Sequence, residues 1–599
     1  MTTPHRPDNR LADFTTHPRV VLLTLMAVTV GAISAVVALA LVRLIGLITH
    51  LVYYHEVAVS MVSPAGNHLG AWAILAPIAG GLVIGLMARY GSERIRGHGI
   101  PEALEAILIG RSRMTLKVAI LKPLSSAVSI GTGGPFGAEG PIIMTGGAFG
   151  SLFAQAFHLS TPERKTLLVA GAAGGMASVF GTPLAATLLA VELLLFEWKP
   201  RSFIPVASAA VVAAALRVPL LGPGPLFPVP PHALLPGHTL PIALGLGLAA
   251  GIGSALLTLL VYGSEDLFAK LPVHWMWWPM LGGLVVGVGG MLEPRALGIG
   301  NDTIADLLAG RLVGAAVLAL LITKAVIWAV ALGSGTSGGV LAPLVLMGGA
   351  LGALAASGLH IPDVSLWAML GMGAMMGGTM RSPFTAVAFV LELTHDINAL
   401  PALLLACVAA DLVTVLLMKR SILTEKVARR GHHVMREYAV SPLHQRRVED
   451  VMERDVPTVP AGLEIPGLFS RLANEDPVLA RRHAWLLVDD AGRLAGLITR
   501  GDLVRALERD DFDACTVLDA GTRAPVVTYP DELLDEAAMK MLEHDIGRLP
   551  VVTRDDPGRL VGYLGRGGVL SAWLHAAQEE RQREPGWLSE TLRGLVRGA

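Results

Sequence analysis

A single carboxylate, Glu139, has the most unusual setting among the residues that could do chemistry. It lies in GTGGPFGAEGP (131–141), where glycines and prolines separate long apolar stretches. A glycine-rich turn that enters a helix presents free backbone N–H groups and the positive end of the helix dipole, and both suit an anion. We therefore expect the amides of this turn to bind either the Glu139 carboxylate or an anion from solution.

Two other turns have a similar composition. They are GHGIPEAL, which begins at Gly97, and GVLAP, which begins at Gly339. In each turn a proline falls at or near the first helical turn, where its missing N–H costs nothing. Several helix N-termini that converge within a membrane can bind an anion without fully buried cations. Alternatively the glycines only allow helices to pack closely, but the recurrence of Gly-x-x-x-Pro at 137–141 and 339–343 favours the anion site.

The elements that hold these turns are predicted to cross a membrane. Of the 599 residues 53% are hydrophobic and 16% are charged, and the mean hydropathy of +0.58 is typical of a polytopic membrane protein. Apolar runs at 19–49, 71–87 and 314–332 approach the roughly 20 residues that a spanning helix needs. We expect an all-α, multi-pass membrane domain over 19–420. The polar segment 1–18 lacks a cleavable-signal pattern and is predicted to be cytosolic.

This membrane part is an internal duplication. The segment GTGGPFGAEGPIIMTGGAFG (131–150) aligns without a gap with GSGTSGGVLAPLVLMGGALG (333–352), and six glycines and one proline match. The two repeats span about 19–221 and 238–420, and a proline-rich segment connects them. Further matches are Lys122 with Lys324, and TPLAATLLAVEL (182–193) with SPFTAVAFVLEL (382–393).

Basic residues predict the orientation of the repeats. The loops of the first half near 86–115 and 160–166 are rich in arginine and lysine, whereas the equivalent loops of the second half offer only Arg295 and Arg311. Cytoplasmic loops are enriched in these residues. The repeats are therefore predicted to be inverted and to contain broken helices, with both chain ends on the cytoplasmic side of a plasma (inner) membrane.

A region of different composition follows the membrane part. The stretch 421–446 is strongly basic, as expected of a linker beside anionic headgroups. Residues 447–510 and 511–576 each alternate short apolar strands with amphipathic helices. The sequence thus predicts a small α/β tandem, followed by a tail at 577–599.

The order of GHGIP, GAEGP and GVLAP across an inverted duplication resembles the CLC chloride channel and transporter family. The tandem resembles the pair of CBS domains found in the longer members, so the resemblance covers nearly the whole chain. It implies a homodimer in the lipid bilayer, with one pore per subunit and chloride as the default anion. The anion-binding positions that it implies are Gly97, His98, Gly99, Ile100, Ala138, Glu139, Gly140, Val340, Leu341 and Leu423.

The resemblance also implies a role for several of these residues. The amides of Val340 and Leu341 would bind the central anion, and the amides of 138–140 would line an outer site. The Glu139 side chain would act as the gate, because protonation removes the charge that holds it at a helix N-terminus. Lys122 would attract anions, unless it is a snorkelling lysine whose amine reaches the membrane surface.

Several positions depart from the pattern of the family. His98 replaces a serine that helps to coordinate the central anion, and Leu423 replaces a tyrosine of the exit helix. His98 is then either a pH-sensitive anion ligand or a bulky plug turned toward the cytosol. Ala138 replaces an arginine or lysine that commonly precedes the gating glutamate, which removes a positive charge from the outer mouth.

The proton path of the family is also altered. Its proton-coupled exchangers carry an inner carboxylate directly after the glutamate that corresponds to Glu192, and Leu193 occupies that position here. The sequence therefore favours passive conduction through a voltage-gated type of anion channel. The alternative is a proton-coupled chloride antiporter of the same fold.

The tandem offers one candidate ligand site. In CBS pairs, residues spaced like Thr499 and Asp502 commonly hold the phosphate and ribose of an adenine nucleotide, whereas the second unit has Gly565 and Gly568 there. The tandem is thus predicted either to bind an adenine nucleotide or to serve as a structural dimerisation module.

Other function classes find little support in the sequence. The two cysteines, Cys407 and Cys515, lie in different regions and exclude a disulfide scaffold. The few acids of the membrane part do not cluster, which argues against a CBS-regulated cation transporter. No nucleophile–base constellation or metal motif is recognisable. We expect no enzyme activity, no metal site and no nucleic-acid partner.

Overall fold

The chain forms two units in the computed structural model. The first unit comprises Met1–Tyr438 with Arg583–Ala599, and the second comprises Ala439–Gln582. Residues 1–17 of the predicted N-terminal segment, most of the predicted linker after residue 432 and the predicted tail after residue 584 lie outside the described residues. The described residues are 18–233, 236–237, 239–432, 434, 443, 446–473, 479, 482–508, 512–581 and 583–584.

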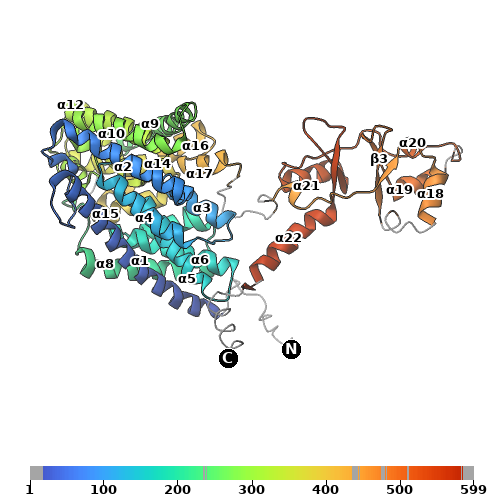
Figure 1. Ribbon diagram of the computed structural model, residues 1–599, viewed down its shortest axis with the longest axis horizontal. Coiled ribbons are helices and arrows are strands. Elements are labelled where there is room, and N and C mark those ends of the chain that lie inside the picture. Colours follow the sequence, from blue (N-terminus) through green and yellow to red (C-terminus); the bar gives the residue numbers. More distant parts are fainter. Residues whose placement is uncertain are drawn as a thin grey trace. The chain divides into compact units, whose positions relative to one another are not determined.

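Helices build almost all of the first unit (Figure 1). Prolines at the first or second helical position begin several of them, including α3, α6, α7 and α8. The elements of the first repeat are α1 (Arg19–Thr49), α2 (Leu75–Tyr90), α3 (Ile100–Leu108), α4 (Leu116–Gly131), α5 (Glu139–Gln155), α6 (Thr161–Phe180), α7 (Pro183–Leu189) and α8 (Pro200–Leu221), with π-helical turns at His50–Tyr54 and Ala190–Leu195 and 3-10 turns at Pro64–Gly66, Gly70–Ile74 and Glu93–Ile95.

The second repeat has the same order of helices. The elements are α9 (Thr239–Ala269), α10 (Trp278–Leu292), α11 (Asn301–Leu308), α12 (Ala315–Gly333), α13 (Leu341–Gly358), α14 (Val364–Met380), α15 (Pro383–Thr394) and α16 (Leu400–Leu417), with 3-10 turns at Trp275–Trp277, Pro294–Ala296 and Ile397–Ala399. The exit helix α17 (Ile422–Arg429) follows. A two-stranded antiparallel pair of β1 (Leu159–Ser160) and β7 (Arg583–Glu584) also belongs to the first unit.

This unit contains both long apolar helices and short ones. Eight helices of the described residues are long and apolar enough to cross a membrane. Others are too short, because α3 has nine residues and α11 has eight, against the roughly 20 needed to span the hydrocarbon core. The unit is thus a multi-pass membrane domain in which broken helices end within the protein.

The two repeats pack against each other in an equivalent way. A Cβ on Gly81 of α2 would lie 2.2 Å from the carbonyl oxygen of Pro279 on α10. In register, a Cβ on Gly283 of α10 would lie 2.2 Å from the carbonyl oxygen of Pro77 on α2. Only glycine allows such an approach of the two helix backbones. The duplication seen in the sequence is therefore also a duplication of contacts.

Glutamates cap helices across the boundary between the repeats. Glu192, just after α7, accepts hydrogen bonds from Thr385 N (2.9 Å) and Thr385 Oγ1 (2.5 Å) at the start of α15. Glu392 on α15 accepts hydrogen bonds from Leu184 N (2.9 Å) and Ala185 N (2.8 Å) at the start of α7. The first N–H groups of a helix have no intrahelical acceptor, so each repeat completes a helix of the other.

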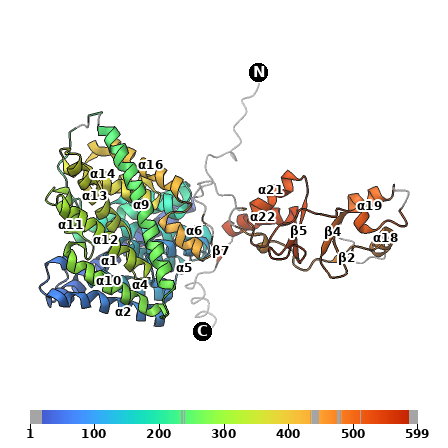
Figure 2. The ribbon, with the colours of Figure 1, turned by 90° about the horizontal axis from the view of Figure 1, so that it is seen from above.

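The second unit contains two small α/β cores. In the first, β2 (Thr458–Pro460) runs parallel to β3 (Ala484–Val488), which pairs antiparallel with β4 (Leu494–Thr499). In the second, β5 (Arg548–Val552) pairs antiparallel with β6 (Leu560–Gly565). Figure 2 shows α18 and α19 beside the first core and α21 and α22 beside the second. The helices are α18 (Ile465–Ala473), α19 (Arg500–Ala506), α20 (Val517–Ala520), α21 (Leu534–Glu543) and α22 (Arg566–Arg581), with a 3-10 turn at Val448–Asp450.

Candidate anion site

Three glycine turns meet inside the membrane unit. Gly339 N donates to Gly137 O at 2.9 Å, and Gly137 N donates to Gly339 O at 3.4 Å. Gly97 N donates to Thr336 O at 3.3 Å, and Gly338 N donates to Gly97 O at 3.4 Å. The backbone segments that precede α3, α5 and α13 are therefore hydrogen bonded to one another, so the N-termini of these three helices converge.

Glycine is required where the first two turns touch. A Cβ on Gly140 would lie 1.9 Å from the carbonyl oxygen of His98, too close for any side chain. Gly99 has a φ of 90°, which L residues rarely adopt, and its Cβ would lie 2.5 Å from Gly140 O. The glycines of GHGIP and GAEGP thus bring two helix starts into backbone contact.

The Glu139 carboxylate is fully buried between the two repeats. Its Oε1 accepts a hydrogen bond from Ala342 N at 3.0 Å, in the first turn of α13. Its own backbone N–H is also a partner, whereas Oε2 is buried with no hydrogen-bond partner among the described residues. The expectation that amides of its own turn bind this carboxylate is therefore incomplete, because an amide of the other repeat contributes.

The other predicted amides surround the same position. Val340 is the N-cap of α13 and Leu341 is its first residue, and both side chains are fully buried. Ala138 is the N-cap of α5, and Gly140 follows Glu139 in its first turn. The first amides of a helix lack intrahelical acceptors. The carboxylate thus lies where the N-termini of α5 and α13 both favour negative charge.

Lys122 is a buried tether. Its Nζ donates to Ile95 O (2.8 Å), Gly97 O (2.7 Å) and Ser337 Oγ (3.0 Å), and its side chain is fully buried. The snorkelling alternative is therefore wrong, because the amine does not reach a membrane surface. Its three acceptors fix the turn before α3 to the segment before α13.

Lys324 repeats this tether in the second half. Its Nζ donates to Ala296 O and Gly298 O, both at 2.9 Å, and its side chain is also fully buried. The matching pattern makes the turn before α11 the counterpart of GHGIP. The alignment of Lys122 with Lys324 in the sequence therefore reflects a shared structural task.

His98 and Ile100 lie inside the protein at the start of α3. The His98 side chain is 2% exposed, and its Nδ1 has no hydrogen-bond partner among the described residues. The neighbouring Glu102 accepts a hydrogen bond from Gly99 N at 2.9 Å and lies 3.1 Å from Arg430. His98 is therefore buried beside a charged cluster that ties α3 to the end of α17.

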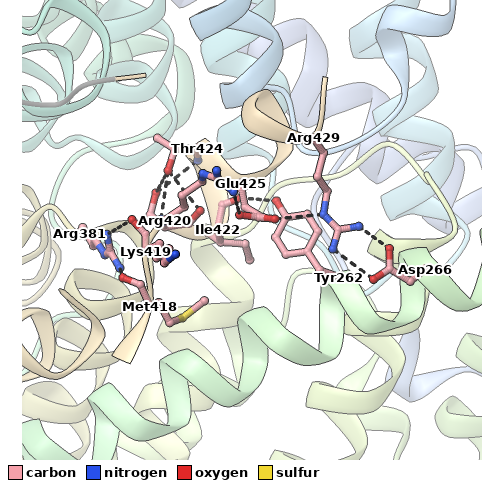
Figure 3. A network of polar contacts seen from close by, with 11 residues as sticks. Tyr262, Asp266, Arg381, Met418, Lys419, Arg420, Ile422, Thr424, Glu425 and Arg429 are labelled. Carbon is pink, nitrogen blue, oxygen red and sulfur yellow. Dashed lines mark hydrogen bonds and ion pairs between the residues drawn. The ribbon is translucent and has the colours of Figure 1, made fainter. Parts of the chain in front are cut away.

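The exit helix is held by α9 (Figure 3). Leu423 is fully buried near the start of α17, and Tyr262 of α9 donates its hydroxyl to the preceding carbonyl, Ile422 O, at 2.5 Å. Arg429 pairs with Asp266 through two hydrogen bonds of 2.5 and 3.2 Å, and its guanidinium lies 4.7 Å from the centre of the Tyr262 ring. Sequence reasoning missed Tyr262, since an isolated tyrosine in an apolar helix carries no spacing signal.

A buried, apolar side chain, that of Leu193, occupies the position at which an inner carboxylate would be expected in an exchanger. Leu193 is 1% exposed and lies in the π-helical turn that follows α7. Glu192 beside it is used as the cap of α15. Neither residue presents a free carboxylate at this position.

A cavity of about 500 Å³ reaches the buried carboxylate. Glu139 and Ala138 line it, together with apolar side chains of α1 and α8. Two arginines, Arg43 and Arg217, also line it. Nothing in the sequence connects these arginines with Glu139, because Arg43 lies on α1 and Arg217 on α8, far from Glu139 along the chain.

The predicted nucleotide residues of the second unit form a local cap. Thr499 N and Thr499 Oγ1 donate to Asp502 Oδ2 at 2.8 and 2.7 Å, and Asp502 N donates to Thr499 Oγ1 at 3.3 Å. This reciprocal capping box starts α19. Their counterparts differ, because Gly565 ends β6 and Gly568 lies in α22. Helix capping alone therefore accounts for the spacing of Thr499 and Asp502, and nucleotide binding stays a prediction.

The chain is similar to known proteins over both units. The family model described as "Voltage gated chloride channel" matches residues 79–415, and the CBS domain model matches residues 448–509 and 517–575. The voltage-gated ClC-type chloride channel ClcB of Escherichia coli O81 (strain ED1a) is 28% identical over 418 residues, which are 68% of this chain and 99% of the relative.

An exchanger and a solved structure are similarly related. The H(+)/Cl(−) exchange transporter ClcA of Klebsiella pneumoniae (strain 342) is 28% identical over 410 residues, which cover 65% of this chain and 84% of the relative. The crystal structure of a slow cyanobacterial Cl−/H+ antiporter has a TM-score of 0.60 at 21% identity, covering 69% of this chain and 99% of that chain. The fold, the converging helix N-termini and the family model agree, and the chain belongs to the voltage-gated chloride channel (CLC) family, with two CBS domains after its membrane domain.

Proposed function

We propose that the protein is a transmembrane anion channel that conducts chloride passively and is gated by Glu139. The observation that carries the proposal is the position of the Glu139 carboxylate, fully buried at the N-terminus of α13. A negatively charged side chain that occupies an amide-lined position excludes an anion from it. Protonation removes this charge, which weakens its hold on the Ala342 amide and opens the position to chloride.

Passive conduction is supported by Leu193, at the position where exchangers of the family carry an inner carboxylate, and by Glu192 beside it. Leu193 is buried and apolar where an inner proton carrier is expected, and Glu192 is engaged as a helix cap. A leucine cannot carry a proton, so this position offers no relay toward Glu139. The channel name of the ClcB relative agrees with this proposal.

A proton-coupled chloride antiporter of the same fold is the second candidate. The ClcA relative is named an exchanger and the similar solved structure is named an antiporter. In such a protein, the protonated Glu139 would itself carry the proton across part of the path. This candidate requires a proton route that bypasses Leu193.

The reversal potential of the reconstituted full-length protein distinguishes the two candidates. Planar bilayers would be held under opposing chloride and pH gradients. A chloride channel reverses near the chloride equilibrium potential, which moves by about 59 mV for each tenfold change in the chloride ratio, and it ignores the pH gradient. A steady shift of the reversal potential with the pH gradient would contradict the channel and favour the antiporter.

The wider setting of the proposed channel follows from the family and from the charge pattern. We propose a homodimer in the plasma (inner) membrane, with one anion path in each subunit and both chain ends in the cytoplasm. The basic loops of the first repeat support this orientation. Proteolysis of intact cells that carry a C-terminal tag checks it, since a cytoplasmic tag survives external protease.

We also propose that the CBS pair takes an adenine nucleotide at Thr499 and Asp502. Both residues lie at the end of β4 and the start of α19, and their spacing is the one at which CBS pairs commonly hold phosphate and ribose. Isothermal titration of the full-length protein with ATP tests the site. Heat of binding that persists in the Asp502→Ala variant would place the nucleotide elsewhere.

A further inference from the structure

The cavity beside Glu139 has an unusual set of polar residues. It measures about 500 Å³ and lies between α1, α8 and the start of α5. Most of its lining is apolar, and Glu139 is the only acidic residue among the lining residues. The remaining polar residues of the lining are Arg43, Ser60, Arg217 and Asn301.

Arg217 is buried with part of its hydrogen-bonding capacity unused. The residue is 8% exposed, and its Nη1 donates to Gly222 O (2.8 Å) and Gly224 O (3.2 Å) just after α8. Its Nε is buried and has no hydrogen-bond partner among the described residues. A guanidinium has five N–H donors in a planar fork and always carries its charge. Arg217 thus brings a permanent positive charge to the cavity wall, while its unpaired Nε packs over Gly181.

Arg43 adds a second positive charge from α1. It is exposed, and within the described part of the chain no carboxylate forms an ion pair with Arg43 or Arg217. When Glu139 is protonated, the described lining residues carry two positive charges and no negative one. A concave site with apolar walls and charge of one sign concentrates counter-ions.

The second repeat has an arginine of its own at the equivalent helix end. Arg381 follows α14 as Gly181 follows α6, in the register that matches 182–193 with 382–393. Arg381 caps the end of α16 by donating to Thr414 O (2.7 Å). It also donates to Lys419 O (3.4 Å) and Met418 O (Figure 3).

The equivalent helix end is therefore completed from another element in the second repeat. In the first repeat, the arginine stands on α8 itself and its guanidinium packs over Gly181, 3.4 Å from where a Cβ would lie. Both repeats thus place a guanidinium at this helix end, and what sets Arg217 apart is that it borders the cavity of Glu139.

We propose that Arg217 and Arg43 form an anion-recruiting site in this cavity, one step before the gate. The site would hold a small monovalent inorganic anion such as chloride, within reach of the position that Glu139 vacates. It would restore, from α8 and α1, the positive charge that Ala138 does not supply beside the gate. This inference rests on the proposed function, since it assumes that chloride passes Glu139.

The test is the chloride dependence of current through the full-length protein in planar bilayers. Chloride would be varied on one side at a time, and gluconate would keep the ionic strength constant. The variants Arg217→Gln and Arg43→Gln should each raise the half-saturating chloride concentration on one side only, by roughly threefold to tenfold. Arg217→Lys should retain much of the wild-type affinity. The difference between wild type and variants should shrink at high ionic strength, because salt screens exposed charge.

A matched control is Arg295→Gln, which removes one exposed arginine of the membrane unit that does not line the cavity. Half-saturation that is unchanged in Arg43→Gln, or that changes equally on both sides, overturns the recruiting site. Arg43 makes the test decisive even if Arg217→Gln fails to fold through loss of its bonds to Gly222 and Gly224. A wild-type protein without chloride current overturns the proposed function and this inference together. Wild-type current with unshifted half-saturation in both variants overturns this inference alone.

Discussion

The two repeats share a structural frame, by which we mean the tethering and capping contacts that hold their backbones, and they differ at the anion site. Lys122 and Lys324 tether equivalent turns, and Glu192 and Glu392 cap equivalent helices across the boundary. Where the first repeat carries Glu139 in the first turn of its helix, the second repeat carries Leu341 in register. Residues common to both repeats thus hold the backbone, whereas the chemistry of the site depends on residues that only one repeat has.

Two further differences follow the same division. The tethered turn before α3 carries His98, whereas the tethered turn before α11 carries Ile299. Near the end of α8, Arg217 lies beside the cavity, whereas at the end of α16 the guanidinium comes from Arg381, which is in register with Gly181. At positions 139 and 98, titratable side chains of the first repeat thus take the place of apolar ones. Substitutions of shared residues are therefore expected to affect stability, and substitutions of unshared residues to affect flux.

The largest effect is expected from the shared lysines. Lys122→Met leaves the buried carbonyl of Ile95 without a donor and removes one donor each from Gly97 O and Ser337 Oγ, and Lys324→Met leaves the carbonyls of Ala296 and Gly298 without a donor. Each buried acceptor without a partner costs about 1–3 kcal/mol. Both variants should therefore lower the thermal unfolding temperature of the purified protein strongly. Lys117→Met, which changes an exposed lysine of the same helix as Lys122, is the control, and equal stability of all three variants would contradict a shared frame.

The next largest effect is expected from Glu139→Gln, which should change chloride flux and not the stability that the shared frame provides. Glu139→Gln keeps the shape of the side chain and removes its charge, as protonation does. A hydrogen bond to a charged group contributes about 1.5–3 kcal/mol, so its loss should raise chloride flux at neutral pH by roughly tenfold or more. Flux through the wild type should rise as the pH falls, because the carboxylate gains a proton and leaves the site, whereas flux through the variant should ignore pH.

Chloride efflux from proteoliposomes across a pH series measures this prediction. Glu56→Gln changes an exposed acid in the same repeat and should behave like the wild type. An unchanged flux in Glu139→Gln would remove the gate assignment. A large loss of thermal stability in that variant would instead place Glu139 in the shared frame.

The capping glutamates should show a smaller and symmetric effect. Glu192→Gln and Glu392→Gln each weaken the capping of a helix start, which typically costs about 0.5–2 kcal/mol. The two variants should lower the unfolding temperature by similar amounts and should leave the reversal potential unchanged. A pH-dependent reversal potential that disappears only in Glu192→Gln would show that this residue takes part in proton transfer and is more than a cap.

The smallest effect is expected at His98, where the repeats differ but no described hydrogen bond to the ring is lost. If the side chain faces the anion path, His98→Ser offers a hydroxyl to the anion and alters the ratio of nitrate to chloride permeability. One hydrogen bond contributes about 1 kcal/mol, or roughly a fivefold change. Bi-ionic reversal potentials measure this ratio. An unchanged ratio would indicate that the buried ring lies behind the anion path.

The shared features could be predicted from the sequence because they recur in it. The gapless match of 131–150 with 333–352 and the two aligned lysines revealed the duplication before any contact was known. Glycine–proline turns marked the helix starts, and these three starts are hydrogen bonded to one another in the structure. Residue patterns that occur in both repeats could be recognised in the sequence, because chance rarely produces the same pattern twice in one register.

The features that only one repeat has depend on contacts between distant segments, and no recurring pattern in the sequence indicates them. Nothing near Glu139 indicates that Ala342 N would reach its carboxylate from the other repeat. The hydroxyl of Tyr262 reaches Ile422 O from another helix, and Arg217 shares a cavity with Glu139 only because α8 packs beside α1. Lys122 allowed two interpretations from sequence, because its burial follows from the packing of the turns around it.

The bond from Ala342 to Glu139 has a consequence for the ancestry of the protein. A half-length ancestor that assembled as a pair of identical, oppositely oriented chains would have presented the same residue at the positions now held by Glu139 and Leu341. It would have had two such carboxylates facing one another, or none. A single glutamate that closes against the amide of the other half could therefore arise only after the two halves were encoded by separate copies that were free to diverge.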